Sequence, residues 1–421
     1  MAEVKPLRTL RYEPAAAGPL EDVIAPPYDV IDDELRAELV ARSPFNVVEI
    51  DLPRAGGGDP YEHAAATMAG WIERGVLVRE DEPALWALRQ DYTAPDGRSL
   101  TRNGFLARVR VEDYGPGRIR PHERTHPGPK EDRLRLTRAT RTNLSPIFSL
   151  FTDPGGAGGA ALAAAAEGEP FAVAADHEGT LNTLWRVAEP GAVAGLADAL
   201  AGSELLIADG HHRYETARVY AEEVGGEGDH RYVLMLLCSL SDPGLTIFPT
   251  HRLLTGLKDD TAKQQAIRET LMRDFDITEL GSAGELEPSD DSAVAFGYMD
   301  SFHRKPYRVT LKDQSIADRA LEGKPEPYRR LDTAVLEALV LRGALGMTED
   351  DISHLHGLDY SKNLEDAIEA VESGRADAGF FMRATPVEQV REVAEAGESM
   401  PPKSTYFFPK VPTGLVFSPL G

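Results

Sequence analysis

The sequence has a single cysteine, Cys238, in 421 residues. One cysteine excludes an intramolecular disulfide and a cysteine metal cage, and its place in the apolar run 232–240 predicts a buried packing residue. Long hydrophobic runs are absent as well, since no stretch approaches the roughly 18 apolar residues of a membrane span. The first residues lack the apolar core and cleavage site of a signal peptide. We therefore expect a cytoplasmic protein with no membrane partner.

Positive charge is scarce: 45 Lys and Arg residues face 69 Asp and Glu residues, which gives a formal net charge of −24. This balance argues against a general nucleic-acid binder, because affinity for phosphate backbones comes mainly from basic surface. An acidic protein still binds a nucleotide where its positive charges gather locally. The length predicts two or three domains, and 42% hydrophobic with 27% charged residues is typical of a soluble globular protein.

The stretch 204–217 holds the most concentrated pattern. An apolar run at 205–208 breaks at Asp209 and Gly210 into two histidines and an arginine, after which apolar residues recur at helical spacing. The pattern predicts a strand, a tight turn and a helix. Gly210 lets a ligand approach the backbone, the helix N-terminus favours an anion, and Arg213 adds a bidentate phosphate donor. The alternative is an ordinary turn with solvated polar residues.

A second concentrated segment, 118–143, carries eight Lys or Arg residues against three Asp or Glu residues. This local excess of positive charge in an acidic protein predicts a bound counter-charge. Prolines make 121–130 a stiff loop that would hold four side chains in fixed directions: His122, Glu123, Arg124 and Lys130. In the helix that follows, Arg133 and its neighbouring arginines either face solvent or help to neutralise phosphate.

A proline-braced loop near the start offers another candidate. Pro26 and Pro27 force an extended path, so Tyr28 and Asp29 project from a stiff turn before a helix at 34–41. Asp29 is then a candidate base or metal ligand. The alternative is a proline turn followed by a helix cap.

Strands and helices alternate without a regular βαβ rhythm, which predicts an α/β (α+β) protein with mixed sheets and flanking helices. The sequence predicts a strand at 43–53, a hairpin of strands 85–92 and 101–111, and a central buried strand at 232–240. Longer helices are expected after 259, at 261–275, 332–345 and 363–373. We expect a catalytic domain at 1–257, with a Gly/Ala-rich excursion at 153–175, and a second domain at 258–421 whose tail docks on the first.

Five motifs point to a family: Ala25-Pro-Pro-Tyr-Asp-Val30, Pro121-His-Glu-Arg-Thr125 with Gly128-Pro-Lys130, Asn143-Leu-Ser-Pro146, Ala208-Asp-Gly-His-His-Arg-Tyr-Glu-Thr-Ala217 and Pro401-Pro-Lys-Ser-Thr-Tyr406. With them the chain resembles, nearly end to end, the family known as domain of unknown function 1015. The turn at 209–213 is also similar to the phosphate-binding turn of the ParB/sulfiredoxin-like superfamily. That superfamily includes free-serine kinases, nucleotide-binding partition proteins and a peroxiredoxin-repair enzyme, and the last is disfavoured because Cys238 lies in a buried run.

The resemblance implies a ParB/sulfiredoxin-like core and a phosphotransferase that uses ATP or ADP on a small hydroxyl-bearing acceptor, with free L-serine the first candidate. Eight residues would bind the nucleotide: Gly210, His211, His212, Arg213, His122, Arg124, Lys130 and Arg133. Glu123 is the expected general base, because its basic surroundings would keep its carboxylate ionised. Asp29 and Asp209 are alternatives for that role, and either could hold Mg²⁺.

Two other classes of function remain open from the sequence. A metal-dependent hydrolase could use a cluster of nitrogen and oxygen ligands: His122, His126, His211, His212 and Asp209. Against it, His122 and His126 lie in a loop broken by Pro127 and Pro129 rather than on one face of a helix, and the many arginines raise the electrostatic cost of a bound cation. A nucleotide-binding regulatory protein without catalysis is the other alternative, and it predicts thermal stabilisation by nucleotide without turnover.

Overall fold

The computed structural model describes residues 3–54, 56–94, 97–116, 118–122, 127–153, 155–200, 203–290 and 292–421. As far as these residues go, the chain divides into two compact units. The first consists of Met1–Pro121, Thr125–Leu245 and Pro409–Gly421, and the second of His122–Arg124 and Thr246–Phe408. Glu123, Arg124 and His126, which the sequence nominated for the site, lie outside the described residues.

A mixed sheet forms the centre of the first unit. Within the described residues its strand order is β6-β11-β8-β12-β5-β4-β10-β9, with β1 pairing β5. β11 runs parallel to β6 and antiparallel to β8, while β8 is parallel to β12. The strands are β1 Val4–Lys5, β4 Leu85–Thr93, β5 Ser99–Arg110, β6 Ile119–Pro121, β8 Ile147–Phe151, β9 Ala172–Ala175, β10 Leu181–Val187, β11 Leu205–Asp209 and β12 Tyr232–Ser239. The predicted α/β class with mixed sheets is confirmed.

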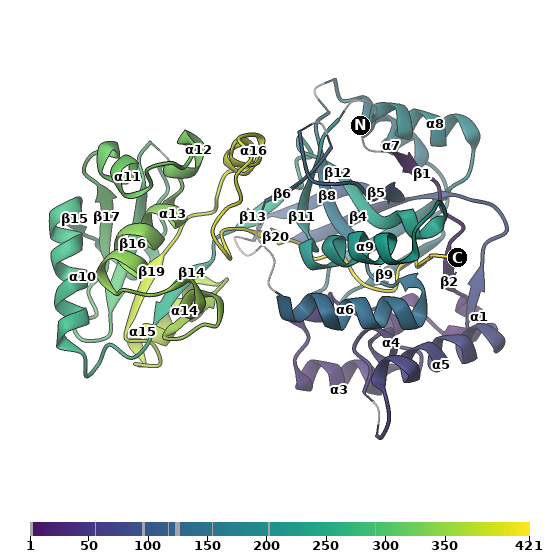
Figure 1. The fold of residues 1–421 in the computed structure, drawn as a ribbon, viewed down its shortest axis with the longest axis horizontal. Helices are drawn as coiled ribbons and strands as arrows, with labels where there is room; N and C mark the ends of the chain where they lie inside the picture. Colours follow the sequence, from purple (N-terminus) through teal and green to yellow (C-terminus); the bar gives the residue numbers. More distant parts are fainter. Residues whose placement is uncertain are drawn as a thin grey trace. The chain divides into compact units, whose positions relative to one another are not determined.

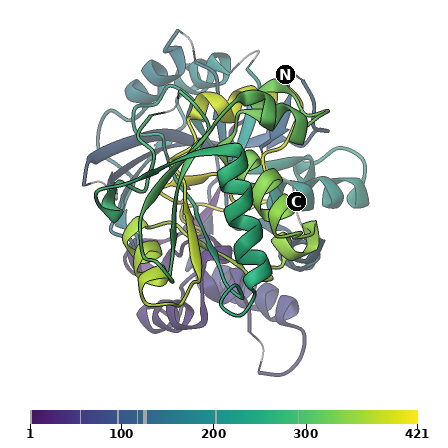
Figure 2. The ribbon, with the colours of Figure 1, turned by 90° about the vertical axis from the view of Figure 1, so that its left-hand side faces the viewer.

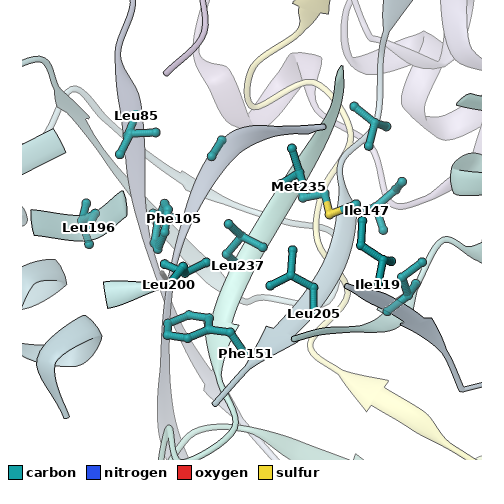
Figure 3. Packing of buried hydrophobic residues seen from close by; sticks show 14 of the residues in the cluster. Leu85, Phe105, Ile119, Ile147, Phe151, Leu196, Leu200, Leu205, Met235 and Leu237 are labelled. Atoms are coloured by element: carbon teal, nitrogen blue, oxygen red, sulfur yellow. The ribbon is translucent and has the colours of Figure 1, made fainter. Parts of the chain in front are cut away.

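The core explains why β12 lies inside this sheet. Its residues Tyr232 to Cys238 are all buried, as expected of a strand whose two faces are both covered. On one face, Met235 and Leu237 pack with Phe105 and Ile147 from the flanking strands (Figure 3). The predicted hairpin is confirmed, because β4 and β5 pair antiparallel from Trp86 through Thr93.

Helices complete the first unit. α9 lies alongside α6, and α6 in turn lies alongside α5 (Figure 1). Two-stranded sheets pair β2 with β3 and β7 with β21. The remaining elements are β2 Leu10–Tyr12, α1 Pro14–Ala17, α2 Leu20–Val23, η1 Tyr28–Val30, α3 Asp33–Arg42, α4 Val48–Asp51, α5 Pro60–Glu73, β3 Leu77–Arg79, α6 Pro127–Thr140, β7 Thr142–Asn143, α7 Ala157–Ala165, α8 Pro190–Ala199, α9 His211–Val224, η2 Asp229–Arg231 and β21 Ser418–Pro419.

The predicted strand at 43–53 is wrong, because these residues form a turn and the short helix α4. Asn46 decides the local structure. Its side-chain oxygen accepts a hydrogen bond from the backbone N–H of Val48 at 3.0 Å, and its amide nitrogen donates to the carbonyl oxygens of Asp22 and Ile24. The turn that Asn46 stabilises places Asp51 at the end of α4.

The second unit contains an antiparallel sheet of order β15-β17-β16-β19-β14-β18, and α10 packs against its edge strand β15 (Figure 2). The helices expected near 261–275, 332–345 and 363–373 are present, the second ending in a π-helical segment. Its elements are β13 Thr246–Phe248, β14 His251–Leu254, α10 Thr261–Asp274, β15 Phe275–Glu279, η3 Ala283–Glu285, β16 Ala295–Asp300, β17 Tyr307–Leu311, α11 Gln314–Ala320, α12 Glu326–Arg329, α13 Asp332–Leu336, η4 Glu337–Ala344, α14 Glu349–Ser353, β18 Leu358–Ser361, α15 Leu364–Glu372, β19 Ala378–Phe381, α16 Val387–Glu395 and β20 Tyr406–Phe408.

Among the helices of the described chain, none combines the length and the apolar character needed to cross a bilayer.

Candidate functional site

The turn after β11 has the predicted form of a strand, a tight turn and a helix. β11 ends at Asp209, Gly210 has φ 94°, and α9 begins at His211. A side chain at Gly210 would have no room, because a Cβ atom there would lie 2.9 Å from Nε and 3.0 Å from Cζ of Arg213. Glycine is therefore required both by the left-handed backbone and by the arginine that lies against the turn.

Arg213 holds this turn to a neighbouring segment of the same unit. Its Nη1 donates to Ser145 Oγ at 2.6 Å and to the carbonyl oxygen of Pro146, and its Nη2 donates to Asp209 Oδ2 at 3.3 Å. The side chain of Arg213 is only 11% exposed. Its Nε is buried and has no hydrogen-bond acceptor within the described chain. The guanidinium group therefore keeps one buried donor that is not used.

Asp209 faces positive charge on both of its oxygens. Besides Arg213, Lys410 Nζ lies 3.5 Å from Asp209 Oδ1. Burial alone would raise the pKa of Asp209, but the positive charges of Lys410, Arg213 and His211 outweigh it and hold this pKa below its ordinary value. Asp209 is thus an ionised carboxylate, and each of its two oxygens already lies close to a cationic side chain of the protein.

A small pocket of about 40 Å³ opens beside Arg213. Three of the five sequence motifs contribute to it, at Tyr28, at Asn143 to Ser145 and at Arg213, and α6 adds Arg133. Its lining residues are Tyr28, Asp51, Arg133, Leu136, Thr137, Thr142, Asn143, Leu144, Ser145, Arg213, Thr216, Ala217 and Val233. Polar and charged groups from segments far apart in the sequence therefore meet at one place.

Arg133 and Asp51 form a buried ion pair in this pocket, with side chains that are 6% and 5% exposed. Arg133 Nη1 donates to the Asp51 backbone oxygen at 2.8 Å and to Oδ1 at 3.1 Å, and its Nε donates to Asp132 Oδ2 at 2.7 Å. The guanidinium group also lies over the ring of Tyr28, 4.3 Å from its centroid. All three nitrogens of Arg133 thus lie against Asp51 or Asp132.

Burial raises the pKa of two groups in this cluster, the Tyr28 hydroxyl and the Asp51 carboxyl. Desolvation raises the pKa of Tyr28 to about 12, against the opposing charge of Arg213. It also raises the pKa of Asp51, although Arg133 and Arg213 act in the other direction. Asp51 Oδ2 is buried and receives no hydrogen bond from the described residues.

The other candidate residues are distributed as follows. Asp29 is exposed in η1, next to Tyr28. His211 is buried and His212 is half-buried in the first turn of α9. Lys130 lies near the start of α6, where its carbonyl oxygen accepts a hydrogen bond from Thr216 at 3.5 Å.

His122 belongs to the second unit. It is buried there, with Nε2 2.7 Å from Thr405 Oγ1 and its ring against Phe407. The structure therefore brings Asp209, Gly210, Arg213 and Arg133 together with the unpredicted Asp51, Ser145 and Lys410.

The ion pairs of Asp209 with Lys410 and Arg213 do not suit a Mg²⁺ ion at this carboxylate. A hard cation there would have to displace Lys410 and Arg213 from the two carboxylate oxygens. Across the part of the chain that is described, no group of three or more His, Cys, Asp and Glu side chains is arranged to hold a metal ion. The described residues therefore provide no metal centre of the kind that the hydrolase alternative requires.

The fold and the site define an α/β protein with a small charged pocket beside a strand-to-helix turn. The family model described as "Protein of unknown function (DUF1015)" matches residues 4–334, so the chain belongs to this family. No curated protein matches the sequence.

Three solved structures illustrate what the chain is similar to. A conserved hypothetical protein from Pyrococcus furiosus is 17% identical, with coverage of 70% of this chain and 92% of the other and a TM-score of 0.36. A free serine kinase in complex with AMP is 16% identical, with coverage of 70% and 88% and a TM-score of 0.37. SbnI with a C-terminal truncation, from Staphylococcus aureus, is 10% identical, with coverage of 73% and 85% and a TM-score of 0.37.

Acid unfolding tests the arrangement around Asp209. Because the pKa of Asp209 is lowered in the folded chain, its ionised form stabilises the fold above the unfolded-chain pKa of about 4, and this contribution is lost as the pH falls below that value. We expect Asp209→Asn to lower the free energy of unfolding by about 1.5–3 kcal/mol at neutral pH. Urea unfolding between about pH 7 and pH 3 should show this deficit shrinking as the solution becomes acidic. A deficit that stays constant over this range would contradict the ion-pair account.

Proposed function

We propose that the first unit is a nucleotide-dependent phosphotransferase. It would bind the phosphates of ATP or ADP beside the turn at 209–213 and phosphorylate a small hydroxyl-bearing metabolite, with L-serine the first acceptor to test. Phosphoryl transfer asks a protein mainly for positioning and for positive charge around the transferred group. The observation that carries the proposal is the convergence of Arg213, Arg133 and the Ser145 hydroxyl on one pocket.

Several features of the turn suit a phosphate group. The first amides of α9 lie at a helix N-terminus, where backbone N–H groups and the helix dipole favour an anion. Arg213 adds its unused Nε donor, and Lys410 adds positive charge nearby. This is the use that the proposed ParB/sulfiredoxin-like turn would make of these residues.

The size of the pocket limits what enters it. A volume of about 40 Å³ exceeds the roughly 10–15 Å³ that one water molecule needs on the same measure. It therefore accepts a group such as a hydroxymethyl or part of a phosphate, but not a whole nucleotide. We infer that the transferred group and the acceptor hydroxyl meet here, while the nucleoside lies outside this pocket.

The charged side chains of the site have different roles in this proposal. Arg133 is held by Asp51 and Asp132, so its role is to fix their positions rather than to bind phosphate directly. Arg213 retains a donor for an incoming oxygen. No step is assigned to Mg²⁺ at Asp209, because that carboxylate is already paired with two cations.

The test is an assay of the purified full chain with ATP or ADP, Mg²⁺ and a panel of hydroxyl-bearing amino acids, with phosphorylated products identified by mass spectrometry. We expect phosphoserine, and we expect nucleotide to raise the melting temperature. Arg213→Lys, which keeps the charge but loses the planar fork, should abolish both effects. Arg138→Ala, on the exposed part of α6, is the matched control and should retain both.

The non-catalytic regulatory alternative predicts a different pattern. In that case nucleotide would stabilise the protein, Arg213→Lys would remove the stabilisation, and no acceptor would be phosphorylated. That result would contradict the phosphotransferase and retain the nucleotide site. Absence of both stabilisation and product would overturn the proposal as a whole.

A further inference from the structure

The ion pair of Asp51 with Arg133 uses only one of its two carboxylate oxygens. Its side chain is 5% exposed, and its backbone oxygen and Oδ1 both accept hydrogen bonds from Arg133. The remaining oxygen, Oδ2, is buried without a donor among the described residues. An unsatisfied buried carboxylate oxygen costs on the order of 1–3 kcal/mol. A hydrogen-bond donor from a bound ligand would remove this cost.

The surroundings of Asp51 suit a proton acceptor. Arg133 and Arg213 bring positive charge toward it, whereas Asp132 and Asp29 bring negative charge. The first two keep the carboxylate ionised, and burial together with the two acids increases its affinity for a proton. A general base works best when its proton affinity is raised toward the working pH in this way.

The other carboxylates near the turn are less suited to this role. Asp209 has both oxygens on cations, and its pKa is lowered, so it is a weak base. Asp29 is exposed to solvent rather than enclosed in the pocket. Among the described residues that line the pocket, Asp51 is the carboxylate found together with Arg213 and Ser145.

We propose that Asp51 is the general base that accepts the proton of the acceptor hydroxyl, and that Arg133 is its positioning residue. This role rests on the proposed phosphotransferase function. The acceptor O–H proton passes to Asp51 Oδ2, the acceptor oxygen bonds to the terminal phosphorus, and the bond from that phosphorus to the bridging oxygen breaks. The nucleotide leaves with one phosphate fewer, and Asp51 returns its proton to solvent.

The decisive variant is Asp51→Asn, which keeps the shape and the hydrogen bond to Arg133 but cannot take up a proton. We expect kcat to fall by about 100-fold or more, while the stabilisation by ATP or ADP remains. Asp113→Asn is the matched control, because its side chain is 74% exposed and pairs with Arg218 on another face of α9. This control should keep the activity of the parent protein.

A second measurement separates chemistry from folding. Asp51→Ala opens space beside Arg133, and added formate should restore part of kcat by serving as the base, whereas chloride at equal ionic strength should not. Arg133→Lys should shift the acid limb of the kcat profile without removing activity, because the base would remain in place.

The outcomes are distinguishable. If the parent protein phosphorylates an acceptor and folded Asp51→Asn does so equally well, the role of Asp51 is wrong and the phosphotransferase stands. If the parent protein phosphorylates no acceptor, the proposed function fails and the role of Asp51 fails with it. Loss of turnover with retained nucleotide binding and rescue by formate supports both.

Discussion

Replacing Arg213 by alanine is expected to lower the free energy of unfolding by about 3–5 kcal/mol, because it removes a guanidinium group that is only 11% exposed and leaves the half-buried carboxylate of Asp209 without one of its cationic partners. The change removes hydrogen bonds to Ser145, to the carbonyl oxygen of Pro146 and to Asp209. Asp209 would then keep the positive charges of Lys410, at 3.5 Å, and of His211. Chemical denaturation at neutral pH measures the loss, and nucleotide should no longer raise the melting temperature.

Arg138→Ala is the control for this effect. Arg138 also pairs with an acidic side chain on α9, Glu223, but the two are 43% and 39% exposed. Exposed ion pairs contribute about 0–1 kcal/mol, so this variant should unfold almost like the parent. Equal losses in the two arginine variants would show that burial does not set the strength of the Arg213 network.

Gly210→Ala is the second change with a large expected effect. The residue has φ 94°, a backbone conformation that costs a non-glycine residue about 1–3 kcal/mol. The new methyl group would also lie 2.9 Å from Arg213 Nε, so the guanidinium group must move away from Asp209 and Ser145. We expect both a lower melting temperature and weaker stabilisation by ATP or ADP, measured by calorimetry with and without nucleotide.

Gly70→Ala separates this result from a general effect of the substitution. Gly70 lies inside α5, and a Cβ atom there would meet nothing within 4 Å. Alanine in a helix is about 0.5–1 kcal/mol more favourable than glycine, so this variant should be slightly stabilised. An unchanged Gly210→Ala protein would show that the turn does not need its left-handed residue.

The parts of the fold that the sequence predicted correctly depend on local patterns. The strand, turn and helix at 205–224 were predicted because the apolar run, Gly210 and the helical spacing act over a few residues. The hairpin of β4 and β5 and the buried strand β12 were predicted for the same reason. Local patterns also placed Arg213 and Arg133 among the candidates, but not their partners.

Asp51 was missed because its segment reads as a strand. Apolar residues at 47, 48 and 50 suit a strand, and the hydrogen bonds of Asn46 convert them into a turn and α4. The one available signal was a carboxylate inside an apolar segment next to a proline. That signal does not show that Arg133, 82 positions later, covers one of its oxygens.

The basic segment at 118–143 illustrates a second limit. Its excess of positive charge was taken to predict a bound anion. Among the described residues, however, four of its arginines pair with acidic side chains of the protein: Arg120 with Glu204, Arg133 with Asp51, Arg135 with Asp59 and Arg138 with Glu223. These acids lie far away in the sequence, and only the tertiary fold brings them close. Lys410, which lies 3.5 Å from Asp209, could not be found from spacing for the same reason.

Residues 409–421 return to the first unit after the whole second unit has been passed. They place Lys410 beside Asp209, and they bond Thr413 to Ala25 and Phe417 to Leu10. During synthesis a ribosome releases these residues after everything else described here, although domains generally fold as they emerge. The first unit therefore cannot form these contacts until the second unit has been synthesised.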